Sequence, residues 1–155
     1  EGVQEGLGVS PEWAVGGLTA SRLRLLAGRV VGVDAMLRGA DFIETFGMLR
    51  GRGIREPTAF SIAARIHRSG GFAKDAIYLR GFKAVCDFVA QGVPLDAFWL
   101  GKIAPSHLPA DEELLQRGLV SAPRHLPEFL GRNDAQARIA GLRQGHSLST
   151  LLTTE

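Results

Sequence analysis

Apolar residues recur every three or four positions along most of this 155-residue chain, which is the spacing of one helix face. The clearest run covers residues 19–37, where Thr19 or Ser21 can cap the first turn and Gly39 can end the helix. A second run, residues 41–49, begins with an aspartate suited to an N-cap. The apolar positions of the two runs are Leu23, Leu26, Val30, Val33, Leu37, Phe42, Phe46 and Leu49.

The remainder of the chain is also predicted to be helical. Pro57 sits where a first-turn proline is tolerated, ahead of a helix over 60–67. The longest helix is expected over 74–91, and shorter ones follow over 95–103, 111–118, 126–130 and 134–142. Leu114, Leu115 and Leu119 are expected to face the core. The sequence therefore predicts an all-α fold, a compact array of seven or eight helices over residues 1–144, with a frayed tail over 145–155.

Composition narrows the class of protein. An apolar content of 45% and a charged content of 22% are typical of a soluble globular protein. No apolar run approaches the roughly 18 residues that cross a bilayer, and no signal peptide is present, so we expect a cytoplasmic protein without a membrane partner. The single cysteine, Cys86, excludes an intrachain disulfide and is expected to be a buried structural thiol. The first residue is Glu1, which favours a fragment or a processed product.

Glu5 is the first candidate for chemistry. On a helix its side is shared by Gly8, Val9, Glu12 and Gly16, a stripe poor in bulky groups. Small residues allow another helix to approach closely, and a carboxylate held there can coordinate a metal that the neighbouring helix presents. On composition alone, a solvated surface glutamate is the more common outcome. Pro11 permits a bend or a restarted first turn in this helix.

The segment 68–78 is the second candidate. Its glycines precede a helix start, where free backbone N–H groups can meet an anion, and Arg68 and Lys74 add positive charge. Lys74 and Tyr78 lie one turn apart on the same side of the helix. A peptide's terminal carboxylate is a ligand that such a site could hold, and Tyr78 could donate a hydrogen bond to an oxyanion. The alternative is a helix cap with surface ion pairs and a half-buried Tyr78. Asp75 could instead orient a neighbouring arginine or cap the helix, and His67 could either contribute to the cleft or be a packed histidine.

Both segments carry a resemblance to one family. Gln4-Glu5-Gly6-Leu7 resembles the QEGLA motif of helical zinc peptidases, with Gly8 in place of the alanine. The segment 68–78 is similar to the family's Arg-Gly-Gly-Gly turn leading to Lys-Asp and Tyr-Leu, with Ser69 replacing the first glycine. The family includes bacterial proteins labelled as flavohaemoglobin expression-modulating and the microtubule-associated tyrosine carboxypeptidases. The likeness continues in order through 22–30, 42–46, 65–79, 101–102 and 119–130.

The resemblance implies a zinc peptidase of HExxxH type. Two histidines of that motif and Glu5 would hold the zinc and leave an open position for water, and the motif's own glutamate would be the general base. The 155 residues contain no HExxxH, and none of the histidines is directly followed by glutamate. We therefore expect the C-terminal part of a larger zincin-like catalytic domain, inactive without a missing N-terminal part that carries HExxxH. The four histidines are His67, His107, His125 and His146.

The function expected from the resemblance is carboxypeptidase-like. Its substrate would be a protein or peptide C-terminus, with Arg68 and Lys74 as substrate-binding residues and Tyr78 as a stabiliser of the oxyanion. The alternative is a non-catalytic helical protein-interaction module whose metal site was lost or never completed, which the missing HExxxH motivates. Nucleic-acid binding is a weaker alternative, because the net charge is only +2 and the arginines are scattered among acids.

Overall fold

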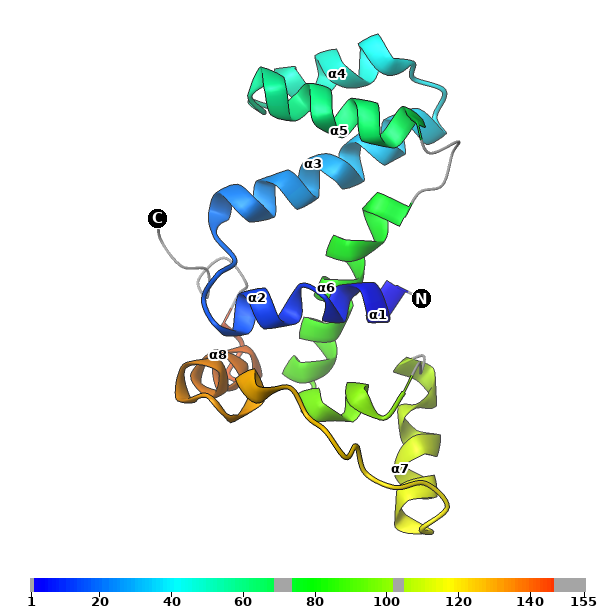
Figure 1. The fold of residues 1–155 in the computed structure, drawn as a ribbon, viewed down its shortest axis with the longest axis vertical. Coiled ribbons are helices and arrows are strands. Elements are labelled where there is room, and N and C mark those ends of the chain that lie inside the picture. The colour runs from blue at the N-terminus through cyan, green and yellow to red at the C-terminus, as the bar shows by residue number, and fades with distance from the viewer. Residues whose placement is uncertain (1, 69–73, 102–104, 147–155) are drawn as a thin grey trace.

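Eight α-helices and three short 3₁₀ helices form the described part of the chain in this computed structural model (Figure 1). Residues 2–68, 74–101 and 105–146 are described, and these ranges contain no β-strand. The prediction of an all-α fold with seven or eight helices is confirmed. The α-helices are α1 (Gly2–Leu7), α2 (Ser10–Ala14), α3 (Ala20–Leu37), α4 (Phe42–Gly51), α5 (Glu56–Arg68), α6 (Lys74–Ala90), α7 (Leu108–Gln116) and α8 (Asn133–Arg143), and the 3₁₀ helices are η1 (Leu95–Trp99), η2 (Pro105–His107) and η3 (Glu128–Gly131).

Local capping sets the bounds of the helices that the sequence predicts best. The Thr19 hydroxyl accepts a hydrogen bond from the Arg22 amide at 3.2 Å, so Thr19 rather than Ser21 caps α3. Asp41 and Glu44 form a capping box at the start of α4, each side chain accepting from the other residue's backbone N–H. Gly39 follows α3 with φ +95°, a conformation that glycine adopts without strain.

The N-terminal segment is not one continuous helix. α1 ends at Leu7, and α2 restarts at Ser10 with Pro11 in its first turn, where proline has no helical hydrogen bond to lose. The Ser10 hydroxyl donates to the Gly6 carbonyl at 3.2 Å across the break. The restarted first turn that Pro11 permits is therefore confirmed.

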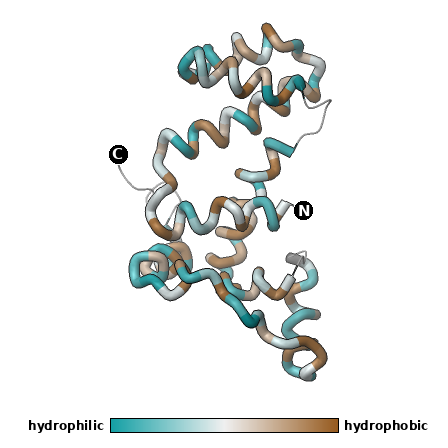
Figure 2. The backbone as a smooth tube through the Cα atoms, in the orientation of Figure 1, coloured by the Kyte–Doolittle hydropathy of each residue, from teal (hydrophilic) through white to brown (hydrophobic). Residues whose placement is uncertain are grey.

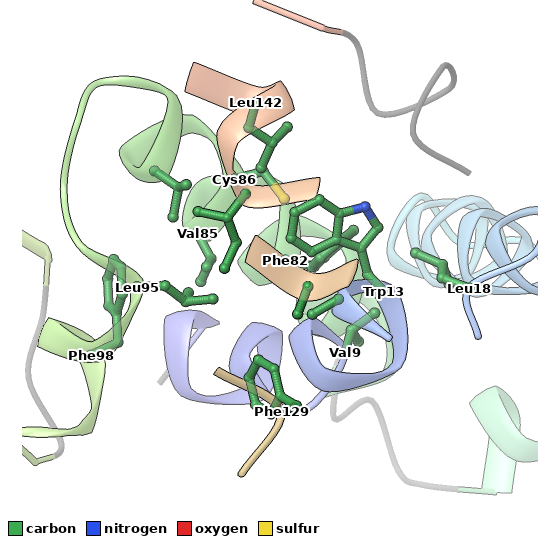
Figure 3. Close-up of a cluster of buried hydrophobic side chains, with 14 of the residues drawn as sticks. Val9, Trp13, Leu18, Phe82, Val85, Cys86, Leu95, Phe98, Phe129 and Leu142 are labelled. Carbon is green, nitrogen blue, oxygen red and sulfur yellow. The ribbon is translucent and has the colours of Figure 1, made fainter. Parts of the chain in front are cut away.

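Two apolar clusters hold the helices together. One joins α1 and α2 to α6 and α8, with Trp13 and Phe82 at its centre, their ring centroids 6.0 Å apart (Figure 3). The other lies between α3, α4 and α5, and includes Leu49 and Ile62. Apolar and polar residues are interspersed along the helices (Figure 2). Full burial of one such side chain stabilises the fold by about 1.5–3 kcal/mol. The position of α6 is set by both clusters, because Ala76 lies in the second and Phe82 in the first.

Several sequence expectations about packing are wrong. α7 begins at Leu108 rather than at residue 111 and contains no buried residue. Leu119, expected in the core, is 68% exposed, and Leu37 is 64% exposed. Both leucines lie in the last turn of a helix or beyond it, where the helical period continues but no neighbouring element covers the side chain. In place of a helix over 95–103 the structure has the 3₁₀ helix η1, and α5 starts four residues before the predicted residue 60. Most of the predicted tail, residues 147–155, lies outside the described residues.

Candidate functional site

α1 crosses α6 with their backbones in contact (Figure 1). A Cβ built on Gly81 would lie 2.7 Å from the carbonyl carbon of Gly2 and 2.9 Å from the amide nitrogen of Gly6, and a Cβ on Gly6 would overlap the backbone of Gly81. Only glycine fits at either position, because backbone atoms cannot rotate away as a side chain can. A close helix contact, as inferred from the glycine-rich start, therefore exists, but the contacting helix α6 contains no histidine. The contact is made by Gly6 against α6.

The glycines that the sequence placed on Glu5's stripe do not make this contact. Gly8 is exposed, and a Cβ there would meet only the carbonyl oxygen of Glu5 at 3.2 Å. Gly16 lies in the turn after α2, with φ +80°. Val9 is buried in the apolar cluster rather than beside the carboxylate. The prediction of which glycines lie at the contact was thus wrong, because the helix breaks after Leu7 and the stripe does not continue through the break.

The α1–α6 crossing brings Glu5 beside Lys74 and Tyr78. Lys74 Nζ lies 3.0 Å from Glu5 Oε1. The hydrogen bond from Lys74 lowers the pKa of the Glu5 carboxyl most, the hydrogen bond from Tyr78 lowers it further, and partial burial opposes both. The Glu5 side chain is 27% exposed, so the ionised carboxylate remains accessible from solvent. Three of the four residues that the sequence singled out for chemistry therefore share one site.

Asp75, the neighbour of Lys74, fixes the first turn of α6. Its side chain is buried, and Arg65 Nε of α5 donates to Oδ1 at 2.8 Å and to Oδ2 at 2.7 Å. Arg29 Nη1 of α3 lies 3.8 Å from Oδ1. One carboxylate thus joins α3, α5 and α6, and raises the pKa of Arg65. Of the roles considered for Asp75, orienting a neighbouring arginine fits the structure.

Arg68 lies elsewhere. It is exposed at the end of α5 and lines a pocket between α3 and α5 together with Arg29 and Arg65. His67 is half-buried, with Nε2 3.0 Å from the hydroxyl of the buried Thr45 and its ring against Phe42. His67 is therefore a packed histidine. The glycine turn proposed to meet an anion, residues 69–73, lies outside the described residues.

Sequence reasoning missed Arg29 and Arg65. Arg65 occurs three residues before Arg68 on one face of α5, a spacing that could have drawn attention to it. Arg29 interrupts the apolar stretch of α3, and its contact with Asp75 depends on tertiary packing. The amide of Gln4, within the QEGLA-like motif, donates to the Gly101 carbonyl at 2.9 Å and so ties α1 to the chain after η1.

Glu5 is a suitable oxygen donor for zinc, since its carboxylate is ionised and partly accessible. It is the one ligand of the predicted site that the described residues supply. Within 2–68, 74–101 and 105–146 no group of three or more His, Cys, Asp or Glu side chains is placed to hold a metal ion. The chemistry of this donor fits zinc, and a zinc site that included Glu5 would need further ligands from elsewhere.

Comparison with known proteins identifies one family. The chain matches the family described as "Microtubule-associated tyrosine carboxypeptidase" over residues 1–146. No curated protein matches the chain, and no solved structure matches it. In the described ranges, every helix is too short or too polar to cross a membrane.

Proposed function

Because this chain belongs to the microtubule-associated tyrosine carboxypeptidase family, we propose that it is part of a zinc-dependent peptidase that removes residues from a protein C-terminus. In this proposal Glu5 is a zinc ligand, and the two histidine ligands come from an HExxxH segment that is not among these 155 residues. The observation that supports it is the cluster of Glu5, Lys74 and Tyr78 at the α1–α6 crossing.

The residues at the crossing have distinct proposed roles. When bound, zinc would act as a Lewis acid on the scissile carbonyl. Lys74 pairs with the Glu5 carboxylate in the structure, and its side chain is 63% exposed, so it can contact the terminal carboxylate of a peptide. The Tyr78 hydroxyl, already within hydrogen-bonding reach of Glu5, would donate to the oxyanion that forms when the carbonyl is attacked. Arg68 stays a predicted substrate-binding residue, although it lines another pocket.

The zinc role of Glu5 is tested in a longer protein that includes the segment upstream. Zinc content is measured by atomic absorption, and release of a C-terminal tyrosine from a peptide is followed in parallel. Glu5→Gln is expected to lose zinc and activity together. The matched control is Glu12→Gln, because Glu12 is a half-buried carboxylate on α2 that pairs with Arg22; this variant is expected to keep its zinc. Stoichiometric zinc in Glu5→Gln, or an upstream segment without HExxxH, contradicts the proposal.

Tyr78→Phe separates chemistry from metal binding. The variant keeps the ring and removes only the hydroxyl, so zinc content and KM are expected to stay near the original values. kcat is expected to fall by about 10²-fold or more, the usual effect of removing one donor to an oxyanion. An unchanged kcat would exclude Tyr78 from this role. A zinc-free longer protein without peptidase activity would instead favour the non-catalytic interaction module.

A further inference from the structure

A pocket between α3 and α5 gathers three arginines, of which the proposed function involves only Arg68, as a predicted substrate-binding residue. Arg65 and Arg68 lie three residues apart on one face of α5, and Arg29 approaches from α3. The hydroxyl residues Thr58 and Ser61 and the apolar Leu25 and Ile62 complete its lining, together with Phe60 and Ala64. The pocket has a volume of about 440 Å³. Its lining offers guanidinium, hydroxyl and apolar groups to a compact ligand.

The positive charge of this pocket is only partly balanced. Asp75 is the one carboxylate within 4.0 Å of these three arginines in the described part of the chain. It accepts from Arg65 Nε and lies 3.8 Å from Arg29 Nη1. One negative charge against three positive charges leaves the cluster with a net charge of +2. Each guanidinium carries five N–H donors, and most of those on the three arginines have no acceptor among the described residues.

Arg29 is the strongest indication that an anion belongs here. Its side chain is 20% exposed, and its Nε atom is buried without a hydrogen-bond partner in the described residues. Desolvation lowers the pKa of Arg29, and the nearby Arg65 and Arg22 lower it further, whereas Asp75 opposes them. An ordinary surface arginine avoids such an environment by extending into water. The Asp75 carboxylate, 3.8 Å from Arg29 Nη1, also accepts both hydrogen bonds from Arg65 Nε, so the charge of Arg29 is only partly compensated.

We propose that Arg29, Arg65 and Arg68 form a binding site for a phosphate group, either free or as a monoester. A phosphate carries nearly two negative charges at neutral pH and so balances the net charge of the cluster. Its oxygens match the forked donors of guanidinium groups, and Asp75 fixes the orientation of Arg65 for that contact. The site is distinct from the Glu5–Lys74–Tyr78 cluster, and the proposal does not depend on peptidase activity.

The proposal is tested by titrating the full chain with inorganic phosphate at constant ionic strength, which sodium chloride maintains. Binding is followed through the side-chain Nε–H signals of the arginines in ¹⁵N NMR spectra. Saturable shifts confined to Arg29, Arg65 and Arg68 are expected. Shifts that sodium chloride alone reproduces, or that spread over exposed arginines elsewhere, would overturn the proposal. A phosphoserine peptide and its unphosphorylated form then distinguish a phosphate monoester from free phosphate as the preferred ligand.

Arg68→Met is the variant of choice, because Arg68 is exposed and makes no ion pair in the described part of the chain. Loss of one charge-assisted contact is expected to weaken phosphate binding about tenfold or more. Arg52→Met is the matched control, since Arg52 is exposed at the end of α4 and lies outside the pocket. This variant is expected to bind phosphate with the same affinity as the original chain. Equal affinities of Arg68→Met and the original chain would refute the site. Glutarate is a second probe, and tighter binding of this dicarboxylate than of phosphate would refute the ligand class.

Discussion

Gly6 and Gly81, 75 positions apart in the sequence, place the backbones of α1 and α6 in direct contact. Neither residue can carry a side chain without moving one of the helices. The contact lies next to Glu5 on α1 and one turn beyond Tyr78 on α6. Backbone packing at two glycines therefore determines how near the carboxylate comes to the lysine and the tyrosine.

This contact predicts that Gly81→Ala is strongly destabilising. The added methyl group overlaps backbone atoms of Gly2 and Gly6, and we expect a loss of about 3 kcal/mol or more in the free energy of unfolding. Urea denaturation followed by circular dichroism measures the loss. Gly47→Ala on α4 is the control, because a Cβ there meets nothing within 4 Å, and it is expected to stabilise the chain by up to about 1 kcal/mol. Similar effects of the two substitutions would contradict the close contact.

Lys74→Met is predicted to raise the pKa of Glu5 towards its ordinary value of 4.5, because the hydrogen bond from Lys74 is the main cause of the lowered pKa. The pH dependence of the Glu5 carboxyl carbon in ¹³C NMR spectra measures this directly. A lowered pKa in the folded state stabilises the fold above the ordinary pKa, and this stabilisation is lost as pH falls through the folded value. The stability difference between Lys74→Met and the original chain should therefore be present at pH 7 and vanish in acid.

The control for this experiment is Lys83→Met, which removes the ion pair with Asp87 further along α6 and should leave Glu5 unchanged. If the titration of Glu5 is the same in all three proteins, Lys74 does not hold the carboxylate in solution.

Cys86 is predicted to be unreactive in the folded chain and to make the fold sensitive to alkali. Burial raises the pKa of its thiol to about 12, from an ordinary value of 9.0. Between these values the unfolded chain releases the proton and the folded chain keeps it, so stability falls by at most about 1.4 kcal/mol per pH unit as pH rises. Denaturation midpoints from pH 8 to pH 11 measure the fall, and Cys86→Ala should lessen it. Rapid reaction of Cys86 with a thiol reagent at pH 8 would contradict the burial of this thiol in the folded chain.

The capping box at α4 is expected to contribute measurably to stability. Asp41→Ala removes the acceptor for the Glu44 amide, at 2.8 Å, and should cost about 1 kcal/mol. Glu44→Gln retains a side-chain acceptor for the Asp41 amide, so it should lower the free energy of unfolding by less than Asp41→Ala. Thermal unfolding of the two variants gives the comparison. Asp41→Ala with an unchanged melting temperature would mean that the box is not formed in solution.

The features that the sequence predicted correctly are local ones. Caps at Thr19 and Asp41, the helix stop at Gly39 and the first-turn proline in α5 each depend on a few neighbouring residues, and all are present. The pairing of Lys74 with Tyr78 on one helix side is likewise local. What brings Glu5 to them is a tertiary contact, and the glycine that makes it was identified only from the structure.

Burial was harder to predict than helix formation. The helical period marks Leu37 and Leu119 as core positions, yet both are exposed because no other element reaches them. Conversely, Arg29 and Asp75 are charged residues whose side chains have little exposure, and their opposite charges lie close together. Such pairs depend on how α3, α5 and α6 meet, and periodicity within one helix carries no information about that. The resemblance of segment 68–78 assigned Arg68 and Lys74 together to substrate binding, whereas the structure places Arg68 with Arg29 and Arg65.

The pairing of α1 with α6 also has a consequence for synthesis on the ribosome. α1 has six residues, fewer than a helix needs to persist alone in water, and its main helix partner, α6, begins only at Lys74. The growing chain must therefore emerge through α6 before Glu5 acquires a fixed position. Until then Glu5 lacks both of its partners at the crossing, so a chain truncated before Lys74 could not assemble the site.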